Sequence, residues 1–412
     1  MNILVVNAGS SSLKYALYDM RDEKELISGY IEKIGSSDSI CNTKTYNGVD
    51  KKEIKKIDNH SMAVNYLVKE LIENNIISKL EDIDAIGHRV LHGGEKYKNS
   101  VEITDEVITD IEALTDLGPL HHPGNLAGIN AFKDKLNTLN VAVFDTSFHQ
   151  SMPKKNYIYP VPYEWYQNDG VRKYGFHGTS HKYITEVMKK KLGFKNVNLV
   201  ICHVGSGASI SCIKDGKCLD TTMGLTPLAG IMMGTRSGDI DPSIIERICK
   251  TRNLEAFEVT KMLNKESGLF GVSGVSDYRD VLKKKEEGDE KASLALDIYH
   301  QRISDQIAVY INRLDGAVDA VVFTAGVLEN SSFARSEIMN KLNAFRVKVD
   351  EMDNNMVGAG KKLKEGIISA YNSNIDFYVV PTNEELMIAR DTYEILKQKT
   401  NDNMNDKVYK KL

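Results

Sequence analysis

Near its start the chain reads Ile3-Leu4-Val5-Val6-Asn7-Ala8-Gly9-Ser10-Ser11-Ser12-Leu13-Lys14. The continuous apolar run at 3–6 is typical of a strand that is buried on both faces. Residues 7–12 are small and mostly polar, as in a turn, and residues 13–18 then show the period-two alternation of a second strand. The stretch therefore predicts a strand, a turn rich in Gly and Ser, and another strand.

The same order returns about half a chain later. Residues 199–204 are strand-like, 205–209 read Gly-Ser-Gly-Ala-Ser, and residues 210–213 lead out of the turn. Two such copies suggest a duplicated α/β domain. The length of 412 residues suits two large domains, and the hydrophobic fraction of 42% with 27% charged residues is ordinary for a soluble globular protein.

Charge and cysteine content exclude several classes of function. The net charge is -4, so no overall basic field argues for nucleic acid or an anionic membrane as partner. No basic leader precedes the first apolar run, and no apolar stretch approaches the roughly 18 residues of a membrane span, so we expect a cytoplasmic protein. The cysteines lack CxxC spacing, and we expect buried free thiols rather than metal ligands or disulfides. They are Cys41, Cys202, Cys212, Cys218 and Cys249.

Further elements follow from spacing and capping. A third glycine turn is predicted at 324–331, after the apolar run 320–323, and a helix should start near Ser331, because Ser is a good N-cap. Apolar residues recur at helical spacing in 291–314, and Thr104 is suited to cap another helix. The last dozen residues are expected to fray.

The three Gly and Ser turns are candidate phosphate sites. Exposed backbone N–H groups and hydroxyls suit phosphate oxygens, and glycine permits close approach of the backbone. Three such turns, each after a buried strand, suit a bound nucleotide, although the GxxxxGK[ST] loop is absent. The alternative is three ordinary turns.

Two arginines stand among glycines, in 87–94 and in 234–239. The neighbouring glycines offer no apolar side chains against which Arg89 and Arg236 could pack. The two-pronged guanidinium group suits a carboxylate or a phosphate. The alternative is two solvated surface arginines.

Histidines and carboxylates complete the candidate chemistry. His177 follows Tyr-Gly-Phe and is suited to donate a hydrogen bond to a phosphoryl oxygen. A zinc site is not indicated, because the sequence has no HExxH motif and offers no convincing third ligand beside His177 and His181. Asp145 and Glu384 each follow a strand-like run, where acids often meet ligand, and either suits Mg²⁺. The alternative for both is a helix cap or a first-turn acid.

At this point the chain resembles the acetate kinase family, within the sugar kinase, Hsp70 and actin superfamily. The resemblance covers essentially the whole chain, with the motifs in the family's order. They are residues 7–14, 144–146, 173–181, 233–236, 239–242 and 381–386.

The resemblance implies an α/β fold of two RNase H-like (actin/Hsp70-type) domains with an active cleft between them. The N-terminal domain would hold residues 1–146 plus 385–412, and the C-terminal domain, residues 147–384, would carry the nucleotide site and the dimer interface. It also implies a homodimer.

The implied reaction is reversible, direct in-line phosphoryl transfer between ATP and acetate, giving acetyl phosphate and ADP, with Mg²⁺ or Mn²⁺. The carboxylate is itself the nucleophile, so the work is positioning and charge neutralisation.

Residue roles follow by matching position. Arg89 and Arg236 would clamp carboxylate and phosphoryl group, His177 would stabilise the equatorial oxygens, and Asp145 would organise the metal. The metal ligands would be Asn7 and Glu384. Ser10, Ser12 and Lys14 would serve phosphate. The methyl pocket would be Leu91, Leu120, Phe176 and Pro227. The nucleotide would meet His203, Gly205, Ser206, Gly207, Asp277, Tyr278, Arg279, Gly326, Val327, Leu328, Glu329 and Asn330.

Several positions depart from the family pattern. Ser206 replaces a usual Asn and Leu328 a usual Gly on the nucleotide side, which leaves GTP or pyrophosphate open as the donor. Leu91 replaces Val, and His122 replaces Asn; the extra methylene of Leu91 should disfavour acids longer than acetate. The alternatives are a propionate or butyrate kinase and a non-catalytic actin-like or chaperone-like nucleotide-binding protein. Arg89, Arg236 and His177 speak against the latter, which needs no carboxylate clamp.

Overall fold

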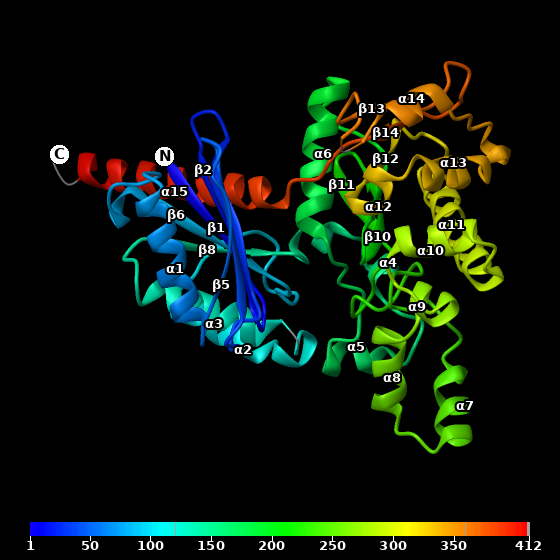
Figure 1. Cartoon of the computed structure of the whole chain (residues 1–412), viewed down its shortest axis with the longest axis horizontal. Coiled ribbons are helices and arrows are strands. Elements are labelled where there is room, and N and C mark those ends of the chain that lie inside the picture. The colour runs from blue at the N-terminus through cyan, green and yellow to red at the C-terminus, as the bar shows by residue number, and fades with distance from the viewer. Residues whose placement is uncertain (120, 359, 410–412) are drawn as a thin grey trace. The chain divides into compact units, whose positions relative to one another are not determined.

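The computed structural model of the chain describes residues 1–119, 121–358 and 360–409 (Figure 1). The chain divides into two compact units. Unit 1 is Met1–Phe148 with Asn383–Leu412, and unit 2 is His149–Thr382. Each unit has its own sheet covered by helices.

Unit 1 is built on an eight-stranded sheet. Its strands are β1 (Asn2–Ala8), β2 (Ser12–Asp19), β3 (Lys24–Glu32), β4 (Ser39–Thr45), β5 (Asp50–Lys55), β6 (Ala85–Val90), β7 (Val101–Glu102) and β8 (Leu139–Phe144). Their order in the sheet is β5-β4-β3-β2-β1-β6-β8-β7. β1 is antiparallel to β2 and parallel to β6, and β6 is parallel to β8.

Helices cover both faces of this sheet. They are α1 (His60–Glu73), α2 (Asp105–Ala113), α3 (His122–Lys133) and α15 (Glu384–Tyr409), with 3₁₀ turns at η1 (Leu80–Asp82), η2 (Thr115–Leu117) and η3 (Ser147–Ser151), the last ending in unit 2. Successive residues of β6 show the two faces, because side chains alternate along a strand. His88 contacts Phe132 of α3, whereas a side chain at Gly87 would meet Thr392 of α15. The core of unit 1 lies between β1–β4 and helices α1 and α3.

Unit 2 is built on a six-stranded sheet. Its strands are β9 (Leu199–Val204), β10 (Ala208–Lys214), β11 (Lys217–Thr221), β12 (Ala320–Thr324), β13 (Gly366–Ile367) and β14 (Phe377–Val379). Their order is β11-β10-β9-β12-β14-β13. β9 is antiparallel to β10 and parallel to β12, and β12 is parallel to β14. This repeats the pattern of β3-β2-β1-β6-β8, so the duplicated α/β arrangement predicted from the two glycine turns is confirmed.

Helices of unit 2 flank its sheet. They are α4 (Lys154–Tyr157), α5 (Tyr163–Asp169), α6 (Gly178–Leu192), α7 (Ser243–Arg252), α8 (Ala256–Lys265), α9 (Gly268–Ser273), α10 (Tyr278–Glu286), α11 (Glu290–Arg313), α12 (Ala325–Asn330), α13 (Ser332–Asn340) and α14 (Glu351–Met356), with a 3₁₀ turn η4 (Asn343–Phe345). On β10, Ser209 faces His181 of α6, and Cys212 faces Tyr310 of α11. The two longest helices of the unit therefore cover opposite faces of the sheet (Figure 1).

The capping predictions are confirmed. The Thr104 side chain accepts a hydrogen bond from the Val107 amide at the start of α2, and Ser331 accepts one from Ala334 at the start of α13. The four cysteines of the strands are buried, Cys249 is partly exposed, and all five are free thiols.

Two local predictions are wrong. Residues 325–330 form α12 rather than an open glycine turn, because Glu329 accepts hydrogen bonds from the Ala325 amide (2.6 Å) and the Thr324 hydroxyl (3.2 Å) and so closes a helical turn. The predicted frayed tail is instead part of a helix up to Tyr409, where α15 ends; 410–412 lie outside the described residues. Across the described ranges, no helix is long and apolar enough to cross a membrane.

Candidate active site

The carboxyl edge of the unit 1 sheet gathers three predicted site residues. Val6 of β1 pairs with His88 of β6, and Val90 pairs with Phe144 of β8, so these parallel strands end side by side. Asn7, Arg89 and Asp145 stand at those ends. Ligands of open α/β sheets bind at this edge.

Arg89 and Asp145 form an ion pair. Arg89 Nε lies 3.0 Å from Asp145 Oδ2, and Nη2 contacts the same oxygen. Asp145 is fully buried, whereas 23% of the Arg89 side chain is exposed. Burial alone would lower the pKa of Arg89, but Asp145 and Glu384 raise it above its ordinary value, so the guanidinium stays charged.

Glu384 brings a second carboxylate to this cluster as the first residue of α15. Burial raises its pKa to about 7; Arg89 opposes this rise, and the negative charge of Asp145 adds to it. Ionisation of Glu384 is therefore less favourable than that of an ordinary glutamate. A bound cation would stabilise the ionised form.

The donor set fits Mg²⁺ better than a softer metal. Across the described ranges, no group of three or more His, Cys, Asp or Glu side chains could hold a metal ion. Two carboxylates and the Asn7 amide would leave positions for water and phosphate oxygens, as Mg²⁺ prefers.

The turn after β1 is held from three sides. The Gly9 amide donates to Ser12 O (2.8 Å), and His60 Nε2 donates to Gly9 O (2.8 Å). Asn125 of α3 donates to Ala8 O (2.7 Å) and accepts from the Leu91 amide (3.2 Å), which ties the ends of β1 and β6 together.

The predicted phosphate residues lie in this turn and at the start of β2. Ser10 and Lys14 are exposed, and Ser12 is partly buried. The sequence interpretation missed Asn125 and His60, because nothing in their local pattern distinguishes them from other helix residues.

The predicted methyl-pocket residues are distributed over both units. In unit 1, Leu91 is buried and its Cδ2 lies 3.2 Å from the position of a Cβ on Gly118, as does His122 Nε2. His122 Nδ1 donates to Ile111 O (3.0 Å). Leu120 lies outside the described residues. In unit 2, Phe176 is buried and Pro227 is partly buried.

In unit 2, Gly207 faces Arg236 and His177. A Cβ on Gly207 would lie 3.5 Å from Arg236 Nη1 and 3.6 Å from His177 Nε2. Arg236 Nη1 donates to the Pro227 carbonyl (3.4 Å), and burial lowers the pKa of Arg236. Among the described residues it forms no ion pair with an Asp or Glu. A partly buried guanidinium without a carboxylate partner is suited to an external anion.

His177 is held in an unusual backbone conformation at the start of α6. Its φ of 55° is in the left-handed region, which is costly for a residue with a Cβ and recurs at functional sites. Its Nδ1 lies 2.9 Å from Ser209 Oγ, and its ring stacks on His203 with centroids 4.2 Å apart. Because the Phe176 carbonyl can only accept, His149 Nε2 donates to it (2.8 Å) and fixes the preceding peptide.

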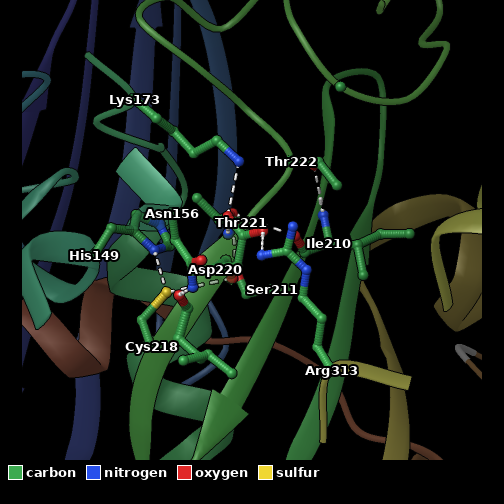
Figure 2. Close-up of polar contacts among 12 residues, drawn as sticks. His149, Asn156, Lys173, Ile210, Ser211, Cys218, Asp220, Thr221, Thr222 and Arg313 are labelled. Atoms are coloured by element: carbon green, nitrogen blue, oxygen red, sulfur yellow. Dashed lines mark hydrogen bonds and ion pairs between the residues drawn. The ribbon is translucent and has the colours of Figure 1, made fainter. Parts of the chain in front are cut away.

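A buried ion cluster supports the loop that carries His177. Figure 2 shows Lys173 and Arg313 reaching Asp220 from different directions, with Cys218 beside His149. Asp220 is 2% exposed; its Oδ1 lies 2.7 Å from Lys173 Nζ, and its Oδ2 pairs with Arg313. Two cations hold one buried carboxylate, and loss of the Lys173 contact would leave Asp220 with Arg313 alone. The sequence interpretation gave Asp220 and Arg313 no role.

A cavity of about 590 Å³ lies in unit 2. Its volume is in the range of small-molecule sites. The predicted residues on its wall are Gly205, Ser206, Asp277, Tyr278, Arg279, Gly326, Val327 and Asn330. It is also lined by residues that sequence reasoning missed, namely Gly234, Leu269, Ser276, Leu282, Tyr299 and Ser331. Gly207 and His203 stand instead with His177.

Leu328 and Glu329 do not line this cavity. Leu328 is fully buried, and the Glu329 carboxylate accepts from Ala325 and from the Thr382 amide (3.1 Å). Leu328 therefore fills core space on the inner side of α12 and does not crowd a ligand in the cavity. Behind α12, the fully buried Arg335 donates to Leu328 O (2.8 Å) and holds this segment.

Comparisons with known proteins agree with this geometry. The sequence model of the acetokinase family matches residues 2–390. An acetate kinase of Bacillus cytotoxicus is 49% identical over 95% of this chain and 98% of its own length. The crystal structure of Porphyromonas gingivalis acetate kinase matches with a TM-score of 0.90 at 41% identity, covering 96% of this chain and 99% of that one. A propionate kinase from Francisella tularensis matches with a TM-score of 0.88 at 40% identity, covering 96% and 99%. The chain belongs to the acetokinase family.

Proposed function

We propose that this chain catalyses reversible phosphoryl transfer between ATP and acetate, giving ADP and acetyl phosphate, with Mg²⁺ as the metal. The observation that carries the proposal is that Arg236 and His177 both lie beside the Cβ position of Gly207, at 3.5 and 3.6 Å. Two donors of hydrogen bonds therefore meet at a glycine, where no side chain fills the position between them and the backbone. A tetrahedral phosphoryl group is the anion that the family chemistry supplies.

The unit 1 residues suit the acceptor and the metal. Acetate is already a nucleophile, so the reaction needs no general base. Arg89 would hold the carboxylate, and its orientation is fixed by Asp145. Glu384 and Asn7 would bind Mg²⁺, with Asp145 organising the site; Mg²⁺ neutralises charge on phosphate oxygens when bound. Ser10, Ser12 and Lys14 would bind phosphate.

The unit 2 residues suit the transferring group. In a loose in-line transition state, charge spreads over the equatorial oxygens of the phosphoryl group. Arg236 and the Nε2 side of His177 would stabilise those oxygens, because fixed donors need no reorganisation during the reaction.

The cavity favours a nucleotide over pyrophosphate as the donor. Pyrophosphate needs no apolar wall, whereas this cavity is lined by Leu269, Leu282 and Val327 together with Tyr278. Gly205, Ser206 and Gly326 stand at the same cavity, and their backbone amides would bind phosphates. Ser206 stands where the family pattern has Asn, so a hydroxyl on a shorter side chain would make the contact that an Asn amide makes there.

Acetate is proposed over longer acids because of Leu91. Its side chain is buried against the Gly118 segment, where His122 also packs. Each extra methylene changes discrimination by only about 1–3 kcal/mol, so propionate is expected to react more slowly rather than not at all.

The assembly and location are proposed with the same function. A homodimer is supported by large apolar side chains exposed on α7–α9, among them Ile244, Phe257 (71%) and Phe270. Light scattering during gel filtration should give twice the mass of one chain. A cytoplasmic location suits the five free thiols.

The decisive experiment is trapping of acetyl phosphate as hydroxamate by the purified protein. ATP, GTP and pyrophosphate are compared as donors, and acetate, propionate and butyrate as acceptors. We expect the highest kcat/KM with ATP and acetate. Arg236→Ala should lower kcat at least 10³-fold, as for removal of an arginine finger. Arg302→Ala, which removes an exposed arginine of α11, is the matched control. Near-normal turnover in Arg236→Ala, or a preference for butyrate, would refute the assignment.

A further inference from the structure

A single hydroxyl group lies between two imidazole rings behind the predicted phosphoryl site. Ser209 Oγ of β10 is 2.9 Å from His177 Nδ1 and 2.8 Å from His181 Nε2. His177 precedes α6 and His181 stands one turn into it, so both rings face the same strand residue. Ser209 and His181 are fully buried.

The number of protons in this chain of contacts is limited. A serine hydroxyl has one hydrogen and can donate to only one of the two ring nitrogens. Its oxygen could accept from both rings, but the buried serine hydrogen would then have no acceptor, because Oγ has no other hydrogen-bond partner among the described residues. One ring therefore accepts and the other donates. With both rings neutral, either His181 Nε2 carries a hydrogen and His177 Nδ1 accepts, or the reverse holds.

The surroundings of His181 decide between the two arrangements. Its second ring nitrogen, Nδ1, is buried and has no hydrogen-bond partner in the described structure. In the reverse arrangement neutral His181 would carry its hydrogen on Nδ1, as a buried N–H group without an acceptor. Orphaned buried N–H groups are rarer than under-satisfied acceptors. The hydrogen of His181 thus belongs on Nε2, from which it reaches Ser209.

We propose that Ser209 and His181 are positioning residues that hold His177 as the neutral tautomer with its hydrogen on Nε2. Ser209 donates to His177 Nδ1, so the remaining hydrogen of the His177 ring is directed to the side of Gly207 and Arg236. The role of that hydrogen as donor to a phosphoryl oxygen rests on the proposed function; the tautomer is a property of the protein alone.

The charged and titratable groups around His177 also favour its neutral form. Arg236 lies beside the same Gly207 position, and the ring of His203 from β9 stacks on His177. His203 in turn faces His181, whose ring meets His149 at 5.6 Å. Burial and the neighbouring His149 and His203 hold the pKa of His181 well below its ordinary value, so His181 stays neutral.

Protonation of His177 would disrupt the chain of contacts. An added proton on Nδ1 would point at a hydroxyl that already donates to it. Ser209 would either turn its hydrogen to a buried position without an acceptor, or turn it toward His181 Nε2, in which case His181 would have to move its own hydrogen to the orphaned Nδ1. His177 therefore acts as an uncharged donor.

The test observes the tautomer directly. In ¹⁵N-histidine-labelled full-length protein without substrate, long-range ¹H–¹⁵N correlation distinguishes the two tautomers and the imidazolium. The resonances are assigned with His177→Asn. We expect neutral Nε2–H for His177 from pH 8 down to 6. An Nδ1–H tautomer or an imidazolium at pH 7 would overturn the proposal.

Matched variants separate this role from a general structural one. Ser209→Ala should mix the His177 tautomers, add an acid limb to the pH profile of kcat and lower kcat about tenfold at pH 7, the factor that about 1.4 kcal/mol gives. Ser211→Ala removes another buried hydroxyl of β10, bonded to Thr221 (2.9 Å), and should change neither. His181→Gln, whose side-chain amide can donate to Ser209, should retain the wild-type tautomer.

Equal effects of Ser209→Ala and Ser211→Ala on the His177 resonances would also overturn the proposal. A wild-type protein that forms no acetyl phosphate would refute the proposed function instead, because the resonance measurement needs no substrate.

Discussion

Arg335 offers the strongest single test of what holds the nucleotide-side segment together. It is fully buried, and its guanidinium makes five hydrogen bonds to oxygen acceptors of two segments. The acceptors are the backbone oxygens of Leu328, Glu329, Asn354 and Val357 and the Asn354 side chain. Replacement by Met keeps much of the volume and removes every donor.

The magnitude follows from two opposing contributions. Hydrogen bonds to a charged group are worth about 1.5 kcal/mol at the low end, so five contribute about 7 kcal/mol. Burial lowers the pKa of Arg335 from its ordinary value to about 10, and at about 1.36 kcal/mol per pKa unit this represents a cost of about 3 kcal/mol for keeping the charge inside. The net loss of stability in Arg335→Met should be about 4 kcal/mol.

Calorimetry and nucleotide kinetics measure the two consequences. A loss of about 4 kcal/mol should lower the Tm of the transition of unit 2 by about 8–16 °C. The KM for ATP should rise more than the KM for acetate, because the Leu328 and Glu329 carbonyls lose their support next to Val327 and Asn330, which line the cavity. Arg302→Met, on an exposed position of α11, should change stability by less than about 0.5 kcal/mol. If the two variants melt within 2 °C of each other, roughly half a kcal/mol, the five bonds do not stabilise this segment.

Three further changes probe separate features. Gly207→Ala adds a methyl group at ordinary contact distance, 3.5 Å from Arg236, so the stability of the protein should be unchanged. The kcat should fall at least a hundredfold, because the methyl group occupies the proposed phosphoryl position. Unchanged turnover would argue against that position. Burial lowers the pKa of His88 to about 4, so the unfolded chain takes up its proton first as pH falls below about 6.5. Wild-type stability should therefore drop by about 2 kcal/mol more than that of His88→Gln between pH 7 and pH 5 in urea titrations, and parallel pH curves would contradict this. Gly124→Ala places a Cβ 2.4 Å from the Gly9 backbone, so it should lower the stability of the protein by about 1–3 kcal/mol and raise the KM for ATP. Gly326→Ala is the control: its Cβ would lie in open space, so stability should be unchanged.

The sequence predicts the strands of both sheets that carry site residues because their burial on both faces leaves a simple signal. The apolar runs at 3–6 and 199–204 become β1 and β9, at the centre of each unit. Local capping chemistry places the starts of α2 and α13 equally well.

Features set by contacts between distant segments are not predictable in this way. Asn125 joins the ends of β1 and β6 through hydrogen bonds to residues 117 and 34 positions away. Asp220 is partnered by Lys173 from the loop before α6 and by Arg313 from α11. The region 325–330 looks like a glycine turn, but it is helical, with the Glu329 carboxylate accepting from the Ala325 amide and from the distant Thr382 amide.

The two proposed clamp arginines are expected to differ, although their sequence settings look alike. Arg89 is paired with the fully buried Asp145, so its removal also takes an ion pair away from a buried carboxylate, at a cost of several kcal/mol. Arg236 has only the Pro227 carbonyl and the Met233 sulfur as hydrogen-bond acceptors in the described structure, so its removal leaves no buried charge behind. Lost activity in an Arg236 variant therefore reports on the anion alone. The same loss in an Arg89 variant combines a lost contact with a disturbed unit 1, and only a melting curve beside the kinetics separates the two.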